Sequence, residues 1–164
     1  MSALTAGKSA PSISLTTTSG QKLTLADALK KGPVLAAFFK VNCPTCQFTL
    51  PFLERIYEKY GSAHFTLWGI SQNDAADSRD FNQEFGIRFP VLLDTAGFAV
   101  SNRYGLTNVP SLFLIAPDGA IQMSSVGFAK EDIERIAVEA ARASSKPVAP
   151  VFKPGEVVPQ YKPG

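Results

Sequence analysis

Continuous apolar runs alternate with amphipathic stretches along this chain, in the order of an α/β protein. Residues 34–39 are all apolar, as expected for a central strand that is covered on both faces. A helix follows over residues 44–60, because Pro44 suits a first helical position and Gly61 a position just past the end. Pro51 lies inside this helix and should kink it. The last helix carries the clearest apolar stripe, formed by Ile133, Ile136, Ala137, Ala140 and Ala141.

Shorter elements are predicted around these three. Asp77 suits the N-cap of a helix, and Pro117-Asp118-Gly119 is a hairpin signal. Strands are expected over residues 13–16, 22–24, 64–71, 90–94, 111–116 and 120–127, and helices over residues 25–31, 77–85 and 98–104. This order predicts a mixed central sheet with helices on both faces and an N-terminal β-hairpin.

The composition changes at Ser144. Prolines recur at 147, 150, 154, 159 and 163, and they are expected to exclude regular structure. We therefore divide the chain into a domain over residues 1–143 and a Pro-rich tail over residues 144–164. The tail is predicted to be extended, or disordered if unpacked, and it could serve as a linker or fold back on the domain.

Composition narrows the function classes. Hydrophobic residues make up 45% of the 164 positions and charged residues 18%, with a net charge of +2. No basic stripe indicates a nucleic-acid partner, and no apolar segment is long enough to span a bilayer. Residues 1–12 do not resemble a signal peptide, so we expect a cytoplasmic location, or a periplasmic one if a signal peptide has been removed. We expect the protein to be a monomer.

The only two cysteines, Cys43 and Cys46, follow the apolar run directly. Cys43 at a helix N-cap would lie in the positive field of the helix end, which lowers a thiol pKa and makes the thiolate available for attack. Cys46, one turn later, is the natural resolving thiol. Pro44 fixes the backbone between them, and Lys40 adds positive charge nearby. Thr45 either donates a hydrogen bond to a sulfur or is a plain first-turn residue.

Other roles for the two cysteines are weaker. A structural disulfide over so short a loop removes little unfolded-state entropy. A zinc site needs about four ligands, and the single histidine, His64, would leave carboxylates to complete the set. His64 is interpreted as a structural or solvent-facing residue at the start of a strand. We therefore expect no metal and no cofactor.

Several motifs together resemble one family. Residues 38–46 with Pro51 resemble the active-site strand and kinked helix of thioredoxin-fold proteins, and segments 68–94 and 104–119 fit the same pattern. Over residues 7–143 the chain resembles the TlpA/ResA-like branch, grouped with the alkyl hydroperoxide reductase/thiol-specific antioxidant superfamily. The resemblance implies that Pro110 is a cis proline against the cysteine pair. It also implies that the Val109 backbone pairs with an extended substrate segment.

The resemblance fails at two positions. The family usually has Trp just before the first cysteine, where this chain has Asn42, so part of a docking surface is missing. Thioredoxins carry a buried acid six residues before the first cysteine, where this chain has Ala37. That acid is thought to help deprotonate the second cysteine, so resolution by Cys46 is expected to be slower or to use water.

The favoured function is thiol–disulfide exchange with protein or small-molecule disulfides, supplied by a thiol reductant. A peroxiredoxin-like peroxidase with Cys43 as the peroxidatic cysteine is the first alternative. Such enzymes usually carry Pro and Thr in a P-x-x-x-T-x-x-C pattern, where this chain has Ala36 and Lys40. The second alternative is a non-enzymatic redox-responsive binding module that uses the Val109 edge or the tail. Glu54, Arg55, Glu58 and Lys59 are interpreted as a solvated helix face.

Overall fold

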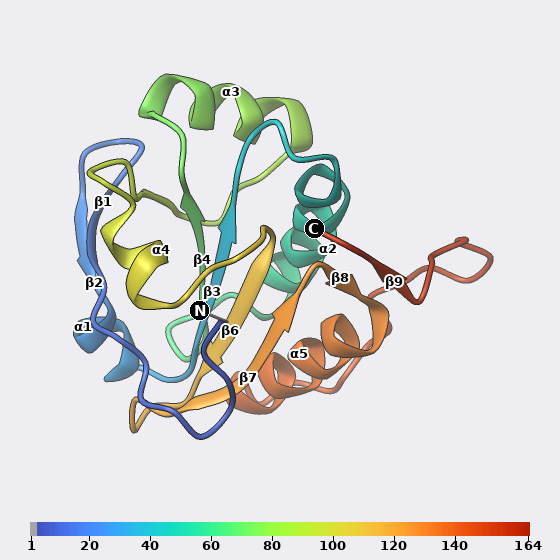
Figure 1. Ribbon diagram of the computed structural model, residues 1–164. Helices are drawn as coiled ribbons and strands as arrows, with labels where there is room; N and C mark the ends of the chain where they lie inside the picture. Colours follow the sequence, from blue (N-terminus) through green and yellow to red (C-terminus); the bar gives the residue numbers. More distant parts are fainter. Residues whose placement is uncertain (1–2) are drawn as a thin grey trace.

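A seven-stranded mixed sheet forms the centre of the molecule in the computed structural model, which describes residues 3–164 (Figure 1). The strand order is β2-β1-β5-β4-β3-β6-β7. The strands are β1 (Ser14–Thr17), β2 (Lys22–Thr24), β3 (Val34–Phe39), β4 (Thr66–Ser71), β5 (Val91–Leu93), β6 (Ser111–Ile115) and β7 (Ile121–Val126). β3, β4 and β5 run parallel, whereas β6 is antiparallel to both β3 and β7. The predicted mixed sheet with its N-terminal hairpin is confirmed.

Helices cover both faces of this sheet, as the order of elements predicted. They are α1 (Leu25–Leu29), α2 (Pro44–Tyr60), α3 (Ala75–Phe85), α4 (Ala99–Arg103) and α5 (Lys130–Ala143). α2, α3 and α5 pack around one core cluster, and α1 and α4 around the other. Within residues 3–164, no helix combines the length and apolar character that a membrane crossing requires.

β3 is apolar throughout because it separates these two cores. Leu35, Ala37 and Phe39 belong to the cluster of α2, α3 and α5. The alternate residues of the strand, among them Phe38, belong to the cluster of α1 and α4. Burial of a side chain such as Phe38 contributes about 2 kcal/mol. The strand therefore gives a rigid base to the loop that follows Phe39, where the two cysteines lie.

α2 begins and ends where the sequence predicts. Cys43 is its N-cap, with an extended backbone (φ −93°), and Pro44 follows in the first turn. The backbone N–H of Gly61 donates to the carbonyl of Tyr57 over 2.8 Å and closes the last turn. Pro51 lies inside the helix, where it has no N–H for the ladder.

Two predicted details are wrong. The N-cap of α3 is Asp74 rather than Asp77, and the Asp77 N–H donates to Asp74 Oδ1 over 2.8 Å. Both residues suit a cap, but only Asp74 precedes the first helical turn. His64 lies in an exposed turn before β4 rather than in the strand. The other element ends differ from the predictions by one or two residues.

The tail folds back on the domain. Tyr161–Lys162 forms a short strand, β9, that pairs with β8 (Phe128–Ala129), so the expectation that proline excludes regular structure here is wrong. Phe152 stacks on Phe52 of α2 with ring centroids 5.0 Å apart. In Figure 1 the red end of the chain lies beside the start of α2.

Candidate active site

Cys43 and Cys46 lie one turn apart at the N-terminal end of α2, both as free thiols. The backbone N–H of Cys46 donates to Cys43 Sγ over 3.1 Å, so the Cys43 sulfur accepts one of the unpaired donors of the helix end. Cys43 is partly exposed, whereas Cys46 is 0% exposed. A substrate can therefore reach the first sulfur, with the second one behind it.

Val109 lies beside the exposed sulfur. Cys43 Sγ donates to the Val109 carbonyl over 3.5 Å, and the Val109–Pro110 peptide bond is cis, as the resemblance implies. β6 begins directly after this bond and pairs with β3, with Ser111 opposite Phe38. Adjacent strands thus bring Val109 to the cysteine loop.

The two sulfurs differ in their surroundings. Burial raises the pKa of the Cys46 thiol above its ordinary value of 9.0, and the hydrogen bond with Cys43 adds to the shift. The backbone and charge of Lys40 act in the opposite direction without cancelling it. Cys46 is therefore a neutral thiol at neutral pH.

The residues next to the two cysteines lie at the rim of the site, except for Thr45. Lys40, Asn42 and Pro44 are exposed at the rim of the site. Thr45 is buried at 8% exposure, and its hydroxyl donates over 2.7 Å to the carbonyl of Pro163 in the tail rather than to a sulfur. The Thr45 hydroxyl therefore binds the tail, and the sequence did not predict that the tail reaches this site.

No carboxylate occupies the position of the thioredoxin acid. Ala37 is fully buried there in β3. A different acid is buried: Glu54 of α2 is 4% exposed, and its Oε1 accepts the backbone N–H groups of Arg88 (2.8 Å) and Phe89 (3.2 Å). Burial raises the pKa of Glu54. The prediction that Glu54 lies on a solvated face is therefore wrong, because the loop before β5 covers it.

Arg55, predicted on the same solvated face, pairs with the tail. Its guanidinium makes two 2.8 Å hydrogen bonds to the carboxylate of Glu156. The hydrogen bonds from Arg55, together with one from the backbone N–H of Lys153, lower the pKa of the Glu156 carboxyl to about 2. Apolar side chains between the prolines, such as Val151 and Phe152, are the signal that could have predicted the docking.

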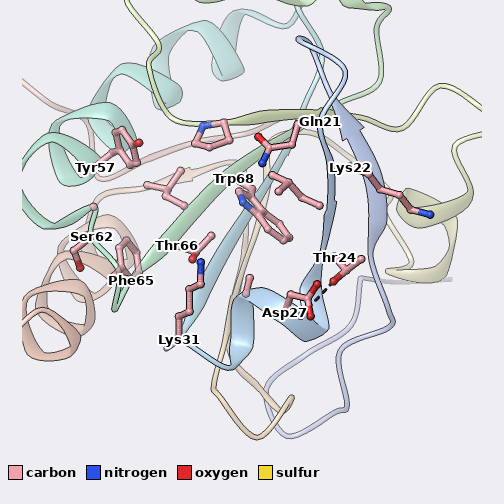
Figure 2. Close-up of a pocket in the computed structure, with 15 residues that line it drawn as sticks. Gln21, Lys22, Thr24, Asp27, Lys31, Tyr57, Ser62, Phe65, Thr66 and Trp68 are labelled. Atoms are coloured by element: carbon pink, nitrogen blue, oxygen red, sulfur yellow. Dashed lines mark hydrogen bonds between the residues drawn. The ribbon is translucent and has the colours of Figure 1, made fainter.

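A hollow of about 350 Å³ opens on one side of Val109. It is lined by Lys40, Gln72, Leu106, Thr107, Asn108 and Val109. A second hollow, of about 460 Å³, lies at the opposite end of the sheet between α1, β2 and the start of β4 (Figure 2). Trp68 and Thr66 line that one, and neither cysteine reaches it.

Within residues 3–164, the His, Cys, Asp and Glu side chains form no group of three that could hold an ion. The arrangement at Cys43 supplies two thiols one helical turn apart and a neighbouring backbone edge. Such a site can pass two electrons between dithiol and disulfide.

Comparison with known proteins points to one family. The sequence model of the AhpC/TSA family matches residues 6–124. A thiol-disulfide oxidoreductase ResA from Geobacillus kaustophilus is 30% identical over 135 residues, 81% of this chain and 76% of the relative. ResA from Bacillus thuringiensis is 29% identical over 130 residues, 78% of this chain and 74% of the relative. The solution structure of a putative protein disulfide isomerase from Bacteroides thetaiotaomicron superposes with a TM-score of 0.79 at 24% identity, covering 89% of this chain and 96% of that one.

Proposed function

This chain belongs to the AhpC/TSA family, as a thioredoxin-fold thiol–disulfide oxidoreductase similar to ResA, and we propose that Cys43 and Cys46 carry its reaction. The supporting observation is the pair itself. One sulfur is accessible and accepts a helix N–H over 3.1 Å, and the other is buried one turn behind it.

In the reductive direction, the Cys43 thiolate attacks one sulfur of a substrate disulfide. A mixed disulfide forms, the substrate S–S bond breaks, and one substrate thiolate leaves and takes up a proton. Cys46 then loses its proton and attacks Cys43 Sγ, releasing the second substrate thiolate. The substrate gains two electrons and two protons, and Cys43–Cys46 becomes a disulfide that an external dithiol reduces again.

We propose supporting roles for the neighbouring residues. The Val109 backbone, ahead of Pro110, offers the edge on which an extended substrate segment pairs. Lys40 adds positive charge where the thiolate forms, and Pro44 restricts the backbone of the first turn. Asn42 leaves the rim polar, so substrate affinity depends on backbone pairing more than on apolar contact.

The proposed unit is one chain, because both cysteines and Val109 come from residues 1–143. The tail, residues 144–164, is then an addition to the thioredoxin-like domain.

The peroxidase alternative is less well supported. Lys40 occupies the threonine position of that pattern, so the site lacks the hydroxyl that a peroxidatic cysteine of that class uses, and Ala36 replaces the proline.

Reduction of hydroxyethyl disulfide and of insulin by dithiothreitol tests the proposal. The Cys43→Ser variant should lose turnover of both substrates, and Cys46→Ser should accumulate a mixed disulfide at Cys43. His64→Ala, in an exposed turn away from the site, is the matched control. Equal rates for wild type and Cys43→Ser would overturn the proposal. Fast peroxide consumption with a sulfenic acid trapped on Cys43 would favour the peroxidase instead.

A redox titration in glutathione buffers distinguishes the two compartments that the sequence allows. A strongly negative potential fits a cytoplasmic reductant. A high potential would fit an oxidant in an exported protein.

A further inference from the structure

Residues 161–164, which we call the strap, lie across the proposed substrate edge. The Thr45 hydroxyl donates to the Pro163 carbonyl over 2.7 Å, two residues from Cys43. Gly164 lies so close to the Val109 carbonyl that a methyl group on its Cα would overlap that oxygen and its carbon. The same Val109 carbonyl is the acceptor for Cys43 Sγ. The strap therefore contacts the backbone that a substrate segment would need.

Several contacts hold the strap in this position. β9 pairs with β8, and the N–H of Lys130 donates to the Gln160 carbonyl over 2.9 Å. The Lys162 ammonium lies 4.5 Å from the centre of the Phe48 ring. Gly127, with a φ of 79°, leaves room for the carbonyl of Lys162, where any side chain would collide.

The rest of the tail anchors the strap from further away. Phe152 packs on Phe52, and Glu156 pairs with Arg55, so the tail stays attached to α2 when the strap leaves its place. A strap that detaches would remain close to its binding position, because the attached tail keeps its local concentration high.

We propose that the strap sets the substrate class of this oxidoreductase, admitting small disulfides and excluding extended polypeptides. The inference rests on the proposed function of Cys43 and Val109. A polypeptide must displace the strap before it can pair with Val109, so its apparent affinity falls by the fraction of molecules in which the strap is open. A small disulfide needs no such pairing.

Cys43 is partly exposed with the strap in place, so a small disulfide can still reach its sulfur. The hollow of about 350 Å³ lined by Lys40, Gln72 and Asn108 adjoins Val109. Most of the residues that line this hollow are polar, and one of them, Lys40, is a cation. A small disulfide with polar or anionic ends therefore fits it better than an apolar one.

The test compares two substrates in the full chain and in a variant from which residues 161–164 are deleted. The deletion should raise insulin reduction by at least about fivefold, because the closed state loses the hydrogen bond of Thr45, which alone accounts for about that factor, together with the β9 and Lys162 contacts. Hydroxyethyl disulfide reduction should stay unchanged. Val157→Ala, at a side chain that is 95% exposed in the tail, is the matched control and should alter neither rate.

A second measurement does not depend on turnover. Alkylation of Cys43 by iodoacetamide should proceed equally in both chains, whereas alkylation by a short bromoacetyl peptide should accelerate on deletion of the strap. An unchanged ratio of insulin to hydroxyethyl disulfide rates, together with an unchanged ratio of alkylation rates, would overturn the inference. If the full chain shows no Cys43-dependent turnover but the alkylation ratio changes on deletion, the proposed function is refuted. The inference that the strap blocks access of peptides to Cys43 then still holds.

Discussion

Release of the substrate from Cys43 should depend steeply on pH, because Cys46 must lose its proton first. Burial is the largest cause of its raised pKa, and a substrate joined to Cys43 should leave Cys46 buried. With a pKa above 9.0, less than about 1% of Cys46 is thiolate at pH 7. Since Ala37 supplies no carboxylate, nothing at that position accepts the proton. The resolution rate should thus rise about tenfold per pH unit, with no plateau below about pH 9.

The assay mixes the reduced protein with a chromophoric disulfide that releases 5-thio-2-nitrobenzoate. Attack by Cys43 gives a first phase that depends on reagent concentration. Attack by Cys46 gives a second, concentration-independent phase, which Cys46→Ser should lack. A second phase that levels off near neutral pH would refute the reasoning, because it would require a lowered Cys46 pKa or an unrecognised base.

Three further predictions concern stability. Glu54→Ala should cost about 2–3 kcal/mol in urea unfolding, because two buried N–H groups lose their acceptor, and Glu54→Gln should cost less. Since the folded-state pKa of Glu54 is raised above 4.5, wild-type stability should fall relative to Glu54→Gln as pH rises from about 4.5; a parallel pair of curves would contradict this. Asp94→Ala should cost about 2–4 kcal/mol, because its carboxylate accepts both the N–H and the hydroxyl of buried Ser101; a loss below about 0.5 kcal/mol would count against it. Because the Glu156 pKa is lowered to about 2, its pairing with Arg55 stabilises the folded protein fully above about pH 4.5 and less as the pH falls toward 2. The difference in urea midpoint between wild type and Glu156→Gln should therefore shrink over that interval, and a constant difference would contradict this.

Local chemistry made part of the fold predictable. The length and apolar character of residues 34–39 favour a strand covered on both faces, and Pro44 and Gly61 mark the two ends of α2. The cysteine pair followed from the same signals, because its chemistry depends on one helix turn. The ends of β5 and the cap of α3 differ from the predictions, because neighbouring residues satisfy the local preferences equally well and tertiary contacts decide between them.

Long-range contacts could not be predicted in the same way. Glu54 lies among charged residues along α2, and nothing local shows that the loop at Arg88 would cover it. The tail is similar: prolines dominate its composition, but a few apolar side chains such as Phe152 are enough to dock it once α2 and β8 provide a surface. The partner surface had to be folded before either side chain could be assigned.

Four of the α2 side chains that meet the tail recur every three or four residues and so form one stripe of the helix; they are Thr45, Phe48, Phe52 and Arg55. Docking of the tail therefore depends on the spacing of these residues along the helix. Inserting a single residue after Cys46 would turn the later contacts about 100° around the axis relative to the first. A thioredoxin-like scaffold engineered to carry residues 144–164 would therefore need this stripe in the same register, together with the hydroxyl of Tyr60 and a β8 edge that can pair with β9.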